Sequence, residues 1–232
     1  MIILFLNSFL LVTFVINLMK TVAVIAAFNE EKRIGKVIRN AKKYVDKIIV
    51  VDDGSGDKTA KISKKAGASV IRYEDNRGKG YATKLGLRKA ISIKPDIIIL
   101  LDADGQHNPI YIPQFINAIE DGADYAYGKR DLSRYPFNRK IGNFGLTLLT
   151  NIICPTGILD TECGYRALSL KSAKKMNLKA DNYGVEMDFA YSIWKNKLKI
   201  KKIKIVVPVF HSKSAIKRGF ENFFYLLKRR FR

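Results

Sequence analysis

The chain has 232 residues, of which 47% are hydrophobic, and a formal net charge of +21. This length suits one domain with a small extension, and the hydrophobic content excludes intrinsic disorder as the default state. The sequence contains two cysteines, Cys154 and Cys163, outside any C-x-x-C pattern. This arrangement argues against a zinc site, excludes a disulfide framework and fits a reducing compartment.

The positive charge is distributed unevenly along the chain. Residues 1–19 carry no charged side chain, whereas the segment from Ser192 onward has thirteen Lys and Arg against one acid, Glu221. A basic excess of this size favours an anionic partner such as nucleic acid, a phosphorylated substrate or an anionic bilayer. A Lys-rich, solvated surface of the kind found in heat-adapted proteins is the alternative explanation.

The first nineteen residues form an apolar segment interrupted by four polar side chains. Its length is close to the roughly 20 residues that span a bilayer, but it lacks the basic leader and cleavage site of a secretory signal. Three interpretations stay open: a membrane anchor, an interfacial helix, or translated upstream sequence with the start at Met19. We therefore divide the chain into residues 1–19, a domain of residues 20–212 and a C-terminal segment of residues 213–232.

From Thr21 onward, continuous apolar runs of strand length alternate with segments whose apolar residues recur at helical spacing. We interpret Asn29 as the N-cap of the first helix. The alternation predicts an α/β fold, a single Rossmann-like domain with a mostly parallel central sheet flanked by helices. The predicted elements are strand 21–28, helix 30–44, strand 47–53, helix 58–66, strand 68–73, helix 78–92, strand 96–104, helix 112–120 and strand 123–130.

The second half of the chain is less regular. It predicts helix 138–153, a turn entering a strand over 160–170, helix 183–197 and strand 199–210 with one wet face. The tail places apolar side chains on one helical face and basic ones on much of the other, which is typical of a helix lying in a membrane interface. A terminal helix packed on the domain is the alternative. The apolar face consists of Ile216, Phe220, Phe223, Phe224, Leu227 and Phe231.

Polar side chains follow the predicted strands at the point where each strand ends. In a parallel sheet, ligands bind beyond the carboxyl ends of the strands, so we expect these side chains to meet in one site. They are Asn29, Glu30, Asp52, Asp53, Asp102, Asp104 and Arg130.

The stretch LLDADGQH directly follows a buried strand. Asp102 and Asp104 are two residues apart, so an extended backbone points both carboxylates the same way. Two carboxylates with the carbonyl oxygen of Gln106 suit Mg²⁺ or Mn²⁺, which takes further oxygens from water and substrate phosphates. A capped turn without a metal is the alternative for so short a motif.

Two glycine-containing turns offer further ligand contacts. In VVDDGSGDKT the carboxylates are placed to accept from a base or ribose, although Asp57 is also placed to cap the following helix. In NRGKGYA, two glycines surround Lys79 at a helix N-terminus, which predicts an anion-binding turn. Neither a P-loop nor a dinucleotide fingerprint is present in the sequence.

Five segments in this order and spacing form a recognisable set: AAFNEE, VVDDGSGDKT, NRGKGYA, LLDADGQH and DTECGYRAL. Together they resemble the family 2 glycosyltransferases of the GT-A fold, in particular the branch that transfers mannose or glucose to polyprenyl (dolichyl) phosphate. The resemblance runs from about Thr21 to Phe210. It implies a GT-A domain, here with an added amphipathic C-terminal helix, and a metal-dependent, inverting hexose transfer from a nucleotide-sugar donor such as GDP-mannose or UDP-glucose.

The resemblance also implies roles for individual residues. It places the nucleotide-sugar site at Ala26, Phe28, Glu30, Asp53, Lys79, Asp102, Ala103, Asp104, Gln106 and Arg130. Within this set it implies Asp102, Asp104 and Gln106 as ligands of Mg²⁺ or Mn²⁺, and Asp104 and Arg130 as the catalytic pair. For the acceptor phosphate it implies Arg139, Arg166, Lys213 and Arg218. Ala26 departs from the family pattern, which often has proline at this position.

The nature of the acceptor decides whether a general base is needed. A lipid phosphate is already an anion and needs none, whereas a saccharide hydroxyl requires a carboxylate, for which Glu186 and Asp188 are the options. A non-catalytic basic module that binds membrane or nucleic acid is a third hypothesis, although no zinc finger or RNP-type motif supports nucleic acid as a partner. We expect the protein at the cytoplasmic face of the cell membrane, bound peripherally or anchored by its N-terminal segment.

Overall fold

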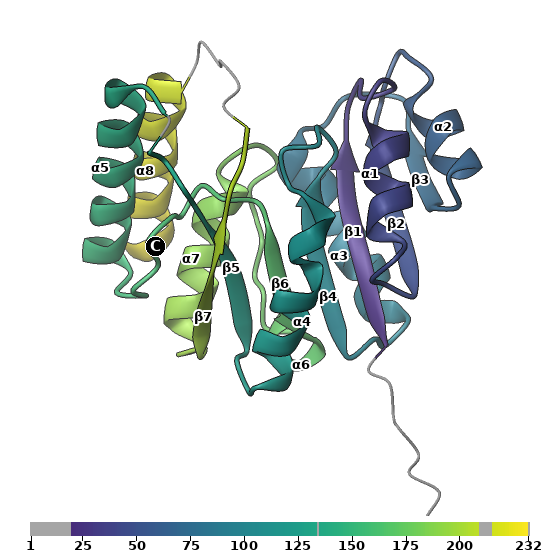
Figure 1. Cartoon of the computed structure of the whole chain (residues 1–232). Helices are drawn as coiled ribbons and strands as arrows, with labels where there is room; N and C mark the ends of the chain where they lie inside the picture. The colour runs from purple at the N-terminus through teal and green to yellow at the C-terminus, as the bar shows by residue number, and fades with distance from the viewer. Residues whose placement is uncertain (1–19, 134, 209–214, 232) are drawn as a thin grey trace, which may run out of the picture.

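The computed structural model describes residues 20–133, 135–208 and 215–231, with the backbone alone for 215–218. One seven-stranded sheet in the order β3-β2-β1-β4-β6-β5-β7 runs through this part of the chain (Figure 1). β6 is antiparallel to both of its neighbours, and the other pairs are parallel. The predicted α/β domain with a mostly parallel sheet is therefore confirmed. The strands are β1 (Thr21–Ala27), β2 (Lys47–Asp53), β3 (Ser69–Tyr73), β4 (Ile97–Asp102), β5 (Tyr125–Arg130), β6 (Arg166–Ser169) and β7 (Ile200–Ile205).

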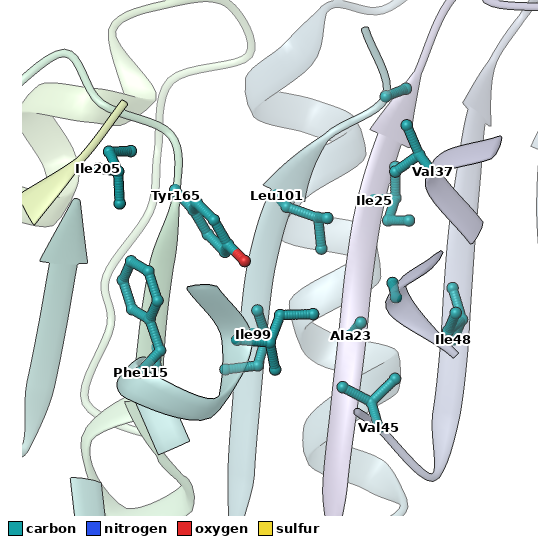
Figure 2. Close-up of a cluster of buried hydrophobic side chains, with 14 of the residues drawn as sticks. Ala23, Ile25, Val37, Val45, Ile48, Ile99, Leu101, Phe115, Tyr165 and Ile205 are labelled. Atoms are coloured by element: carbon teal, nitrogen blue, oxygen red, sulfur yellow. The ribbon is translucent and has the colours of Figure 1, made fainter. Parts of the chain in front are cut away.

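The central strands form because their apolar, largely β-branched sequences favour a pleated strand that is buried on both faces. Val24 of β1 lies in register with Ile49 of β2 and Leu100 of β4, and all three face one core. Since successive side chains point to opposite faces, Ile25 and Ile99 face the other core (Figure 2).

Helices cover both faces of the sheet. α1 and α4 pack on the core that contains Val37 and Phe115, and α3 and α7 pack on the opposite core. A short loop joins β1 to α1, β2 to α2 and β3 to α3, and these loops lie together at one edge of the sheet (Figure 1). The helices are α1 (Ile34–Ala41), α2 (Thr59–Lys65), α3 (Lys79–Ser92), α4 (Ile112–Glu120), α5 (Phe137–Ile153), α6 (Leu170–Ala173), α7 (Val185–Lys195) and α8 (Ala215–Phe231), with a short 3-10 turn η1 (Pro109–Tyr111).

α5 and α8 lie side by side at the end of the molecule away from α2 (Figure 1). Leu146 of α5 and Cys154, which directly follows that helix, pack with Met187 of α7 and Leu226 of α8 in a small separate core. The C-terminal helix is thus packed on the domain, as the alternative interpretation of the tail held. In the described ranges, we find no helix with the length and apolarity that crossing a membrane requires.

The prediction that Asn29 caps α1 is wrong. α1 begins at Ile34, and Asn29 lies in the left-handed region with φ 53°. Its backbone N–H donates to Ser55 Oγ at 2.9 Å, and its Oδ1 accepts from the backbone N–H of Gly56 at 3.0 Å. Asn29 therefore joins the loop after β1 to the loop after β2.

Some predictions fall on residues outside this description. Residues 1–19 and Lys213 lie outside the described residues, and so does the side chain of Arg218. The three interpretations of the N-terminal segment and the two basic acceptor residues therefore stay predictions.

Candidate active site

Two cavities lie at the edge of the sheet where the parallel strands end. The strand-end cavity has a volume of about 470 Å³, and the helix-side cavity, toward α5 and α8, a volume of about 370 Å³. The strand-end cavity is lined by eight of the residues predicted for the nucleotide-sugar site: Ala26, Phe28, Glu30, Asp53, Lys79, Asp102, Ala103 and Asp104. The helix-side cavity is lined by the predicted residues Gln106, Arg130, Arg139 and Glu186.

The two cavities meet at four residues that line both of them. These are Lys79 from the start of α3, Asp102 and Asp104 from the end of β4, and Tyr183 from the loop before α7. A molecule that extends from one cavity into the other must pass this junction. The two cavities thus lie end to end, with the carboxylates of the LLDADGQH motif between them.

The loop after β1 forms one wall of the strand-end cavity. Phe28 exposes 45% of its surface there, which leaves an aromatic face available to a ligand. The carboxylate of Glu30 accepts from Arg33 Nε at 2.7 Å, and the backbone N–H of Glu30 donates to Thr59 Oγ1 at 2.8 Å. Burial raises the pKa of Glu30, although the Arg33 guanidinium opposes the rise.

Asp53 organises the opposite wall of the same cavity. Its carboxylate accepts from Tyr73 Oη at 2.7 Å, from Asn76 Nδ2 at 3.1 Å, and from the backbone N–H groups of Arg77 and Gly78 at 2.7 and 2.9 Å. These bonds hold the turn that enters α3, where Gly78 has φ 96°. The sequence predicted a contact of Asp53 with the base, and the structure adds a positioning role for this carboxylate.

Asp102 ends β4 beside two basic groups. Lys79 Nζ lies 2.9 Å from Asp102 Oδ1. The backbone N–H of Asp102 donates to Nδ1 of the buried His107 at 3.0 Å. Because Nδ1 accepts this bond and burial lowers the pKa of His107, the imidazole is neutral at Asp102. Burial is the largest influence and opposes ionisation of Asp102, but Lys79, His107 and Arg166 together outweigh it and hold the pKa of this carboxyl well below its usual range.

Asp104 and Gln106 form a tight turn around Gly105, whose φ is 78°. The backbone N–H of Gln106 donates to Asp104 Oδ1 at 2.9 Å, and its Nε2 donates to Oδ2 at 2.6 Å. The amide of Gln106 thus positions the carboxylate of Asp104 through its nitrogen. The expected ligand role of the Gln106 carbonyl oxygen stays a prediction.

The residues at the junction fit a hard divalent cation that is shared with a phosphate group. Asp102 and Asp104 supply carboxylate oxygens to the same cavities, and the described part of the chain has no third Asp, Glu, His or Cys placed to complete a metal site with them. Mg²⁺ and Mn²⁺ bind in this way, through one or two carboxylates, several waters and substrate phosphates. The donor set therefore fits the predicted metal only together with a bound diphosphate.

Arg130 ends β5 and is fixed by a buried carboxylate. Its Nε and Nη2 each lie 2.8 Å from an oxygen of Asp160, and Nη2 also donates to Asn143 Oδ1 at 3.1 Å. Bidentate pairing with a carboxylate holds a guanidinium in a defined plane. Asp160, the first residue of the DTECGYRAL segment, is therefore the residue that orients Arg130 in the helix-side cavity.

The helix-side cavity is closed by the two helices at the end of the molecule. α5 contributes Arg139 near its first turn, and α8 contributes the buried Asn222. Arg130 and Arg139 both line this cavity and offer an anion two cationic partners, although carboxylates line it as well: Asp102, Asp104, Glu162 and Glu186. The contribution of α8 shows that this helix belongs to the site as well as to the domain.

Arg166 and Glu186 form a buried ion pair beneath the junction. The Arg166 guanidinium donates to Glu186 Oε2 and lies 4.2 Å from the ring centre of Phe189. The other carboxylate oxygen of Glu186 lies 3.2 Å from Lys79 Nζ. Arg166 lines neither of the two larger cavities, so the structure does not place it where the predicted contact with an acceptor phosphate would occur.

Asp188 is fully buried and lies away from both larger cavities. Its Oδ2 accepts from the backbone N–H groups of Lys179 and Ala180 at 2.6 and 2.7 Å. Its Oδ1 accepts from Tyr225 Oη at 2.8 Å and from Arg229 Nε at 3.0 Å. This carboxylate therefore joins α7 to α8 and to the loop before α7, and its hypothetical role as a base has no support from its position.

Six polar residues that line the two cavities were not singled out from the sequence: Asn76, Tyr135, Glu162, Asn182, Tyr183 and Asn222. Asn76 is the first residue of the recognised segment NRGKGYA, so its place in that motif was a usable signal. Tyr183 and Asn222 lie in segments whose patterns indicate only amphipathic helices. Nothing in the sequence near these two residues pointed to the cavities.

Comparisons with known proteins agree with this geometry. The sequence model of glycosyl transferase family 2 matches residues 22–176. A UDP-N-acetylglucosamine–dolichyl-phosphate N-acetylglucosaminyltransferase of Methanococcus voltae is 33% identical over 222 residues, covering 84% of this chain and 88% of that protein. A dolichol-phosphate mannosyltransferase of Pyrococcus furiosus is 30% identical over 185 residues, covering 73% of this chain and 52% of that protein.

Solved structures share the fold. Glucosyl-3-phosphoglycerate synthase from Mycobacterium tuberculosis, in a crystal structure with Mn²⁺, UDP and glucosyl-3-phosphoglycerate, superimposes with a TM-score of 0.72. The alignment covers 91% of this chain and 80% of that chain at 21% sequence identity. At this identity the likeness concerns the fold alone, and it confirms the predicted GT-A architecture.

Proposed function

This chain belongs to glycosyl transferase family 2, and on that premise we propose that it transfers a hexose from a nucleotide-sugar donor to a polyprenyl phosphate at a membrane surface. The observation that carries the proposal is the pair of cavities that meet at Asp102 and Asp104. The strand-end cavity takes the nucleotide, the junction takes the diphosphate and the sugar, and the helix-side cavity takes the acceptor phosphate.

Donor binding follows from the lining of the strand-end cavity. The exposed ring of Phe28 packs against the base, and the carboxyl groups of Glu30 and Asp53 lie within the same cavity for polar contacts with base and ribose. The diphosphate lies at the junction beside Lys79. The sugar is glucose, mannose or, as the name of the M. voltae relative suggests, an N-acetylated hexose.

Asp102 and Asp104 would hold Mg²⁺ or Mn²⁺ together with the diphosphate, and this ion would supply charge stabilisation of the departing nucleoside diphosphate. Arg130 carries a permanent positive charge, oriented by Asp160, on the other side of the junction. Fixed charges that face a site where negative charge develops stabilise a transition state without reorganisation. These two carboxylates and the oriented Arg130 are the catalytic residues of the proposal.

The acceptor phosphate binds between Arg130 and Arg139 in the helix-side cavity. A phosphate oxygen is already anionic, so its attack on the anomeric carbon requires positioning and no proton acceptor. Attack from this cavity approaches the sugar from the side opposite the strand-end cavity. The reaction therefore inverts the anomeric centre.

The membrane contact is made by the outer faces of α5 and α8, which we call the apolar helix face. These side chains are exposed although they are large and hydrophobic, and they lie on two adjacent helices: Phe137, Ile141, Phe144, Leu148, Ile152, Phe220, Phe224 and Phe231. Lys140 and Lys228 supply positive charge on the same helices. Apolar residues flanked by basic ones favour the surface of an anionic bilayer, and Arg139 and Asn222 of the same helices line the acceptor cavity.

Vesicle binding tests the apolar helix face. The double variant Phe144→Ser, Ile152→Ser removes two side chains that are each 67% exposed, and we expect it to reduce sedimentation with phosphatidylglycerol vesicles at least tenfold. Ile110→Ser is the matched control, because Ile110 is 60% exposed but lies in η1. Equal sedimentation of the double variant and the wild type would exclude this face as the contact.

The reaction itself is tested by transfer of label from a panel of radiolabelled sugar nucleotides into organic-extractable lipid phosphate. We expect label in the lipid phase with Mn²⁺ or Mg²⁺, none with EDTA, and a loss of about 100-fold or more in Asp104→Asn. Asp121→Asn, an exposed acid in the turn after α4, is the control with unchanged activity. Hydrolysis of a donor without lipid labelling would contradict the acceptor, and the absence of any donor turnover would contradict the enzymatic function.

A further inference from the structure

Four charged side chains form a continuous chain from the junction into the protein interior. Asp102 Oδ1 lies 2.9 Å from Lys79 Nζ, Lys79 Nζ lies 3.2 Å from Glu186 Oε1, and Glu186 Oε2 accepts from the Arg166 guanidinium. The charges alternate in sign, and their formal sum is zero. The chain links β4, α3, α7 and β6, which are distant in sequence.

The inner half of this chain is shielded from solvent. Arg166 and Glu186 are 3% and 5% exposed, and Phe189 packs on the guanidinium. The enclosed space beside them has a volume of about 20 Å³, which is enough for about one water molecule. Charges in such surroundings interact strongly, so the pair between Arg166 and Glu186 fixes the position of the Glu186 carboxylate.

Lys79 is the member of the chain that reaches a ligand. Its side chain is a quarter exposed and lines both larger cavities. An ammonium group has three donors, and the contacts with Asp102 and Glu186 use two of them. The third donor remains for an anion at the junction.

The backbone at Gly164 lies close against the pair formed by Lys79 and Asp102. A Cβ atom built on Gly164 would lie 3.0 Å from Lys79 Nζ and 2.9 Å from the nearer carboxylate oxygen of Asp102. A side chain at Gly164 would therefore displace both partners. Because residue 164 is a glycine and has no side chain, the Lys79 ammonium and the Asp102 carboxylate can lie in contact beside the cavity.

We propose that Lys79 is a fixed cation that binds the donor diphosphate, and that Glu186, held by Arg166, is the positioning residue that keeps Lys79 at the junction. The proposal rests on the nucleotide-sugar donor of the proposed function. Glu186 supplies a second carboxylate, so Lys79 stays in place when Asp102 also binds a metal ion. Arg166 acts through Glu186 and does not touch the acceptor.

This assignment gives Glu186 a role other than general base. Both oxygens of Glu186 already contact cations, Lys79 Nζ on one side and the Arg166 guanidinium on the other, so these two groups hold the carboxylate in place. Glu186 therefore lies beside the helix-side cavity because it contacts Lys79 there.

The test measures binding of UDP and GDP by calorimetry, with and without Mn²⁺, for Lys79→Met, Glu186→Gln and the double variant. We expect Lys79→Met to weaken binding of the preferred diphosphate roughly ten- to hundredfold, because it removes a hydrogen bond to a charged group. Glu186→Gln should weaken it less, and the double variant should be no weaker than Lys79→Met alone. Lys89→Met, on the exposed face of α3, is the control for the loss of one charge.

Uridine and guanosine separate this role from a general loss of structure. They lack the diphosphate, so their affinities should not change in Lys79→Met. Glu186→Asp keeps the negative charge, so it should recover part of the diphosphate affinity that Glu186→Gln loses. Independent, additive losses in the double variant, or an equal loss for nucleoside and diphosphate, would overturn the proposal. A wild-type protein that binds no nucleotide would instead contradict the proposed function itself, and the positioning role would fail with it.

Discussion

Asp188→Asn is the substitution that most sharply separates a structural from a chemical role at the start of α7. The side chain is fully buried, and its two oxygens accept four hydrogen bonds, one of them from the Arg229 guanidinium. Asparagine keeps the shape but removes the charge and presents an NH₂ group to groups that are themselves donors. The Arg229 guanidinium is then left nearly buried without its counter-charge.

The expected cost follows from this geometry. Removing one partner of a buried ion pair destabilises a protein by about 3–5 kcal/mol, and the retained amide oxygen places the estimate near the lower end, at about 3 kcal/mol. For a chain of this size, about 3 kcal/mol corresponds to a decrease in Tm of roughly 6–12 °C. Urea unfolding and a thermal scan measure the two quantities.

Asp181→Asn is the matched control, because it removes an ion pair with Lys84 whose acid is 63% exposed. We expect a change of about 0.5 kcal/mol or less in the free energy of unfolding. A change of the same small size in Asp188→Asn would refute the reasoning. So would a stable Asp188→Asn protein whose turnover number alone collapses, since that is the behaviour of a general base.

Three further predictions concern the rest of the site. Gly164→Ala should lower the transfer rate about 100-fold, because its Cβ would lie 2.9 Å from a carboxylate oxygen of Asp102, whereas Gly142→Ala, with open space around its Cβ, should not. Both cysteines are buried, and burial raises their thiol pKa values to about 11 and about 12, so iodoacetamide at pH 8 should label them only after unfolding. Labelling of the native protein would contradict this. Because burial raises the pKa of Glu30, the folded state loses stability as the pH rises through that raised value. Glu30→Gln should therefore unfold at a higher temperature than the wild type at pH 7.5 and lose this advantage at pH 4, and equal Tm differences at both pH values would contradict the shift.

The strands that position the site could be predicted because their sequences allow only one interpretation. β1, β2 and β4 are nearly unbroken apolar runs that end in polar residues, and parallel pairing brings those ends to one edge. Phe28, Asp53 and Asp102 are more than twenty residues apart in sequence, yet they line one cavity. The order of the motifs along the chain was therefore enough to predict that these residues meet in one site.

Pairings between distant side chains could not be predicted in this way. Arg166 and Glu186 lie 20 residues apart, and each alone suggested contact with a ligand or a base. Their mutual neutralisation depends on how α7 packs against β6, which no local pattern encodes. The same holds for Asp188, whose partner Arg229 lies 41 residues away on α8.

Asn29 shows how tertiary contacts override a local rule. An asparagine before a helical pattern predicts an N-cap, but here the loop after β2 offers Ser55 and Gly56 as partners for its backbone and side chain. The residue adopts a left-handed conformation to reach them. Capping rules describe an isolated helix end, and this end lies against a second loop.

The central claim is that the acceptor is a phosphate anion bound between Arg130 and Arg139. Its most direct test compares sugar transfer to a polyprenyl phosphate with transfer to the corresponding polyprenol, under the same donor, metal and vesicle conditions. We predict labelling of the phosphate and none of the alcohol, because Arg130 and Arg139 line the cavity proposed for the acceptor and favour an anion there. Equal labelling of polyprenol, or transfer only to a water-soluble saccharide, would contradict the account.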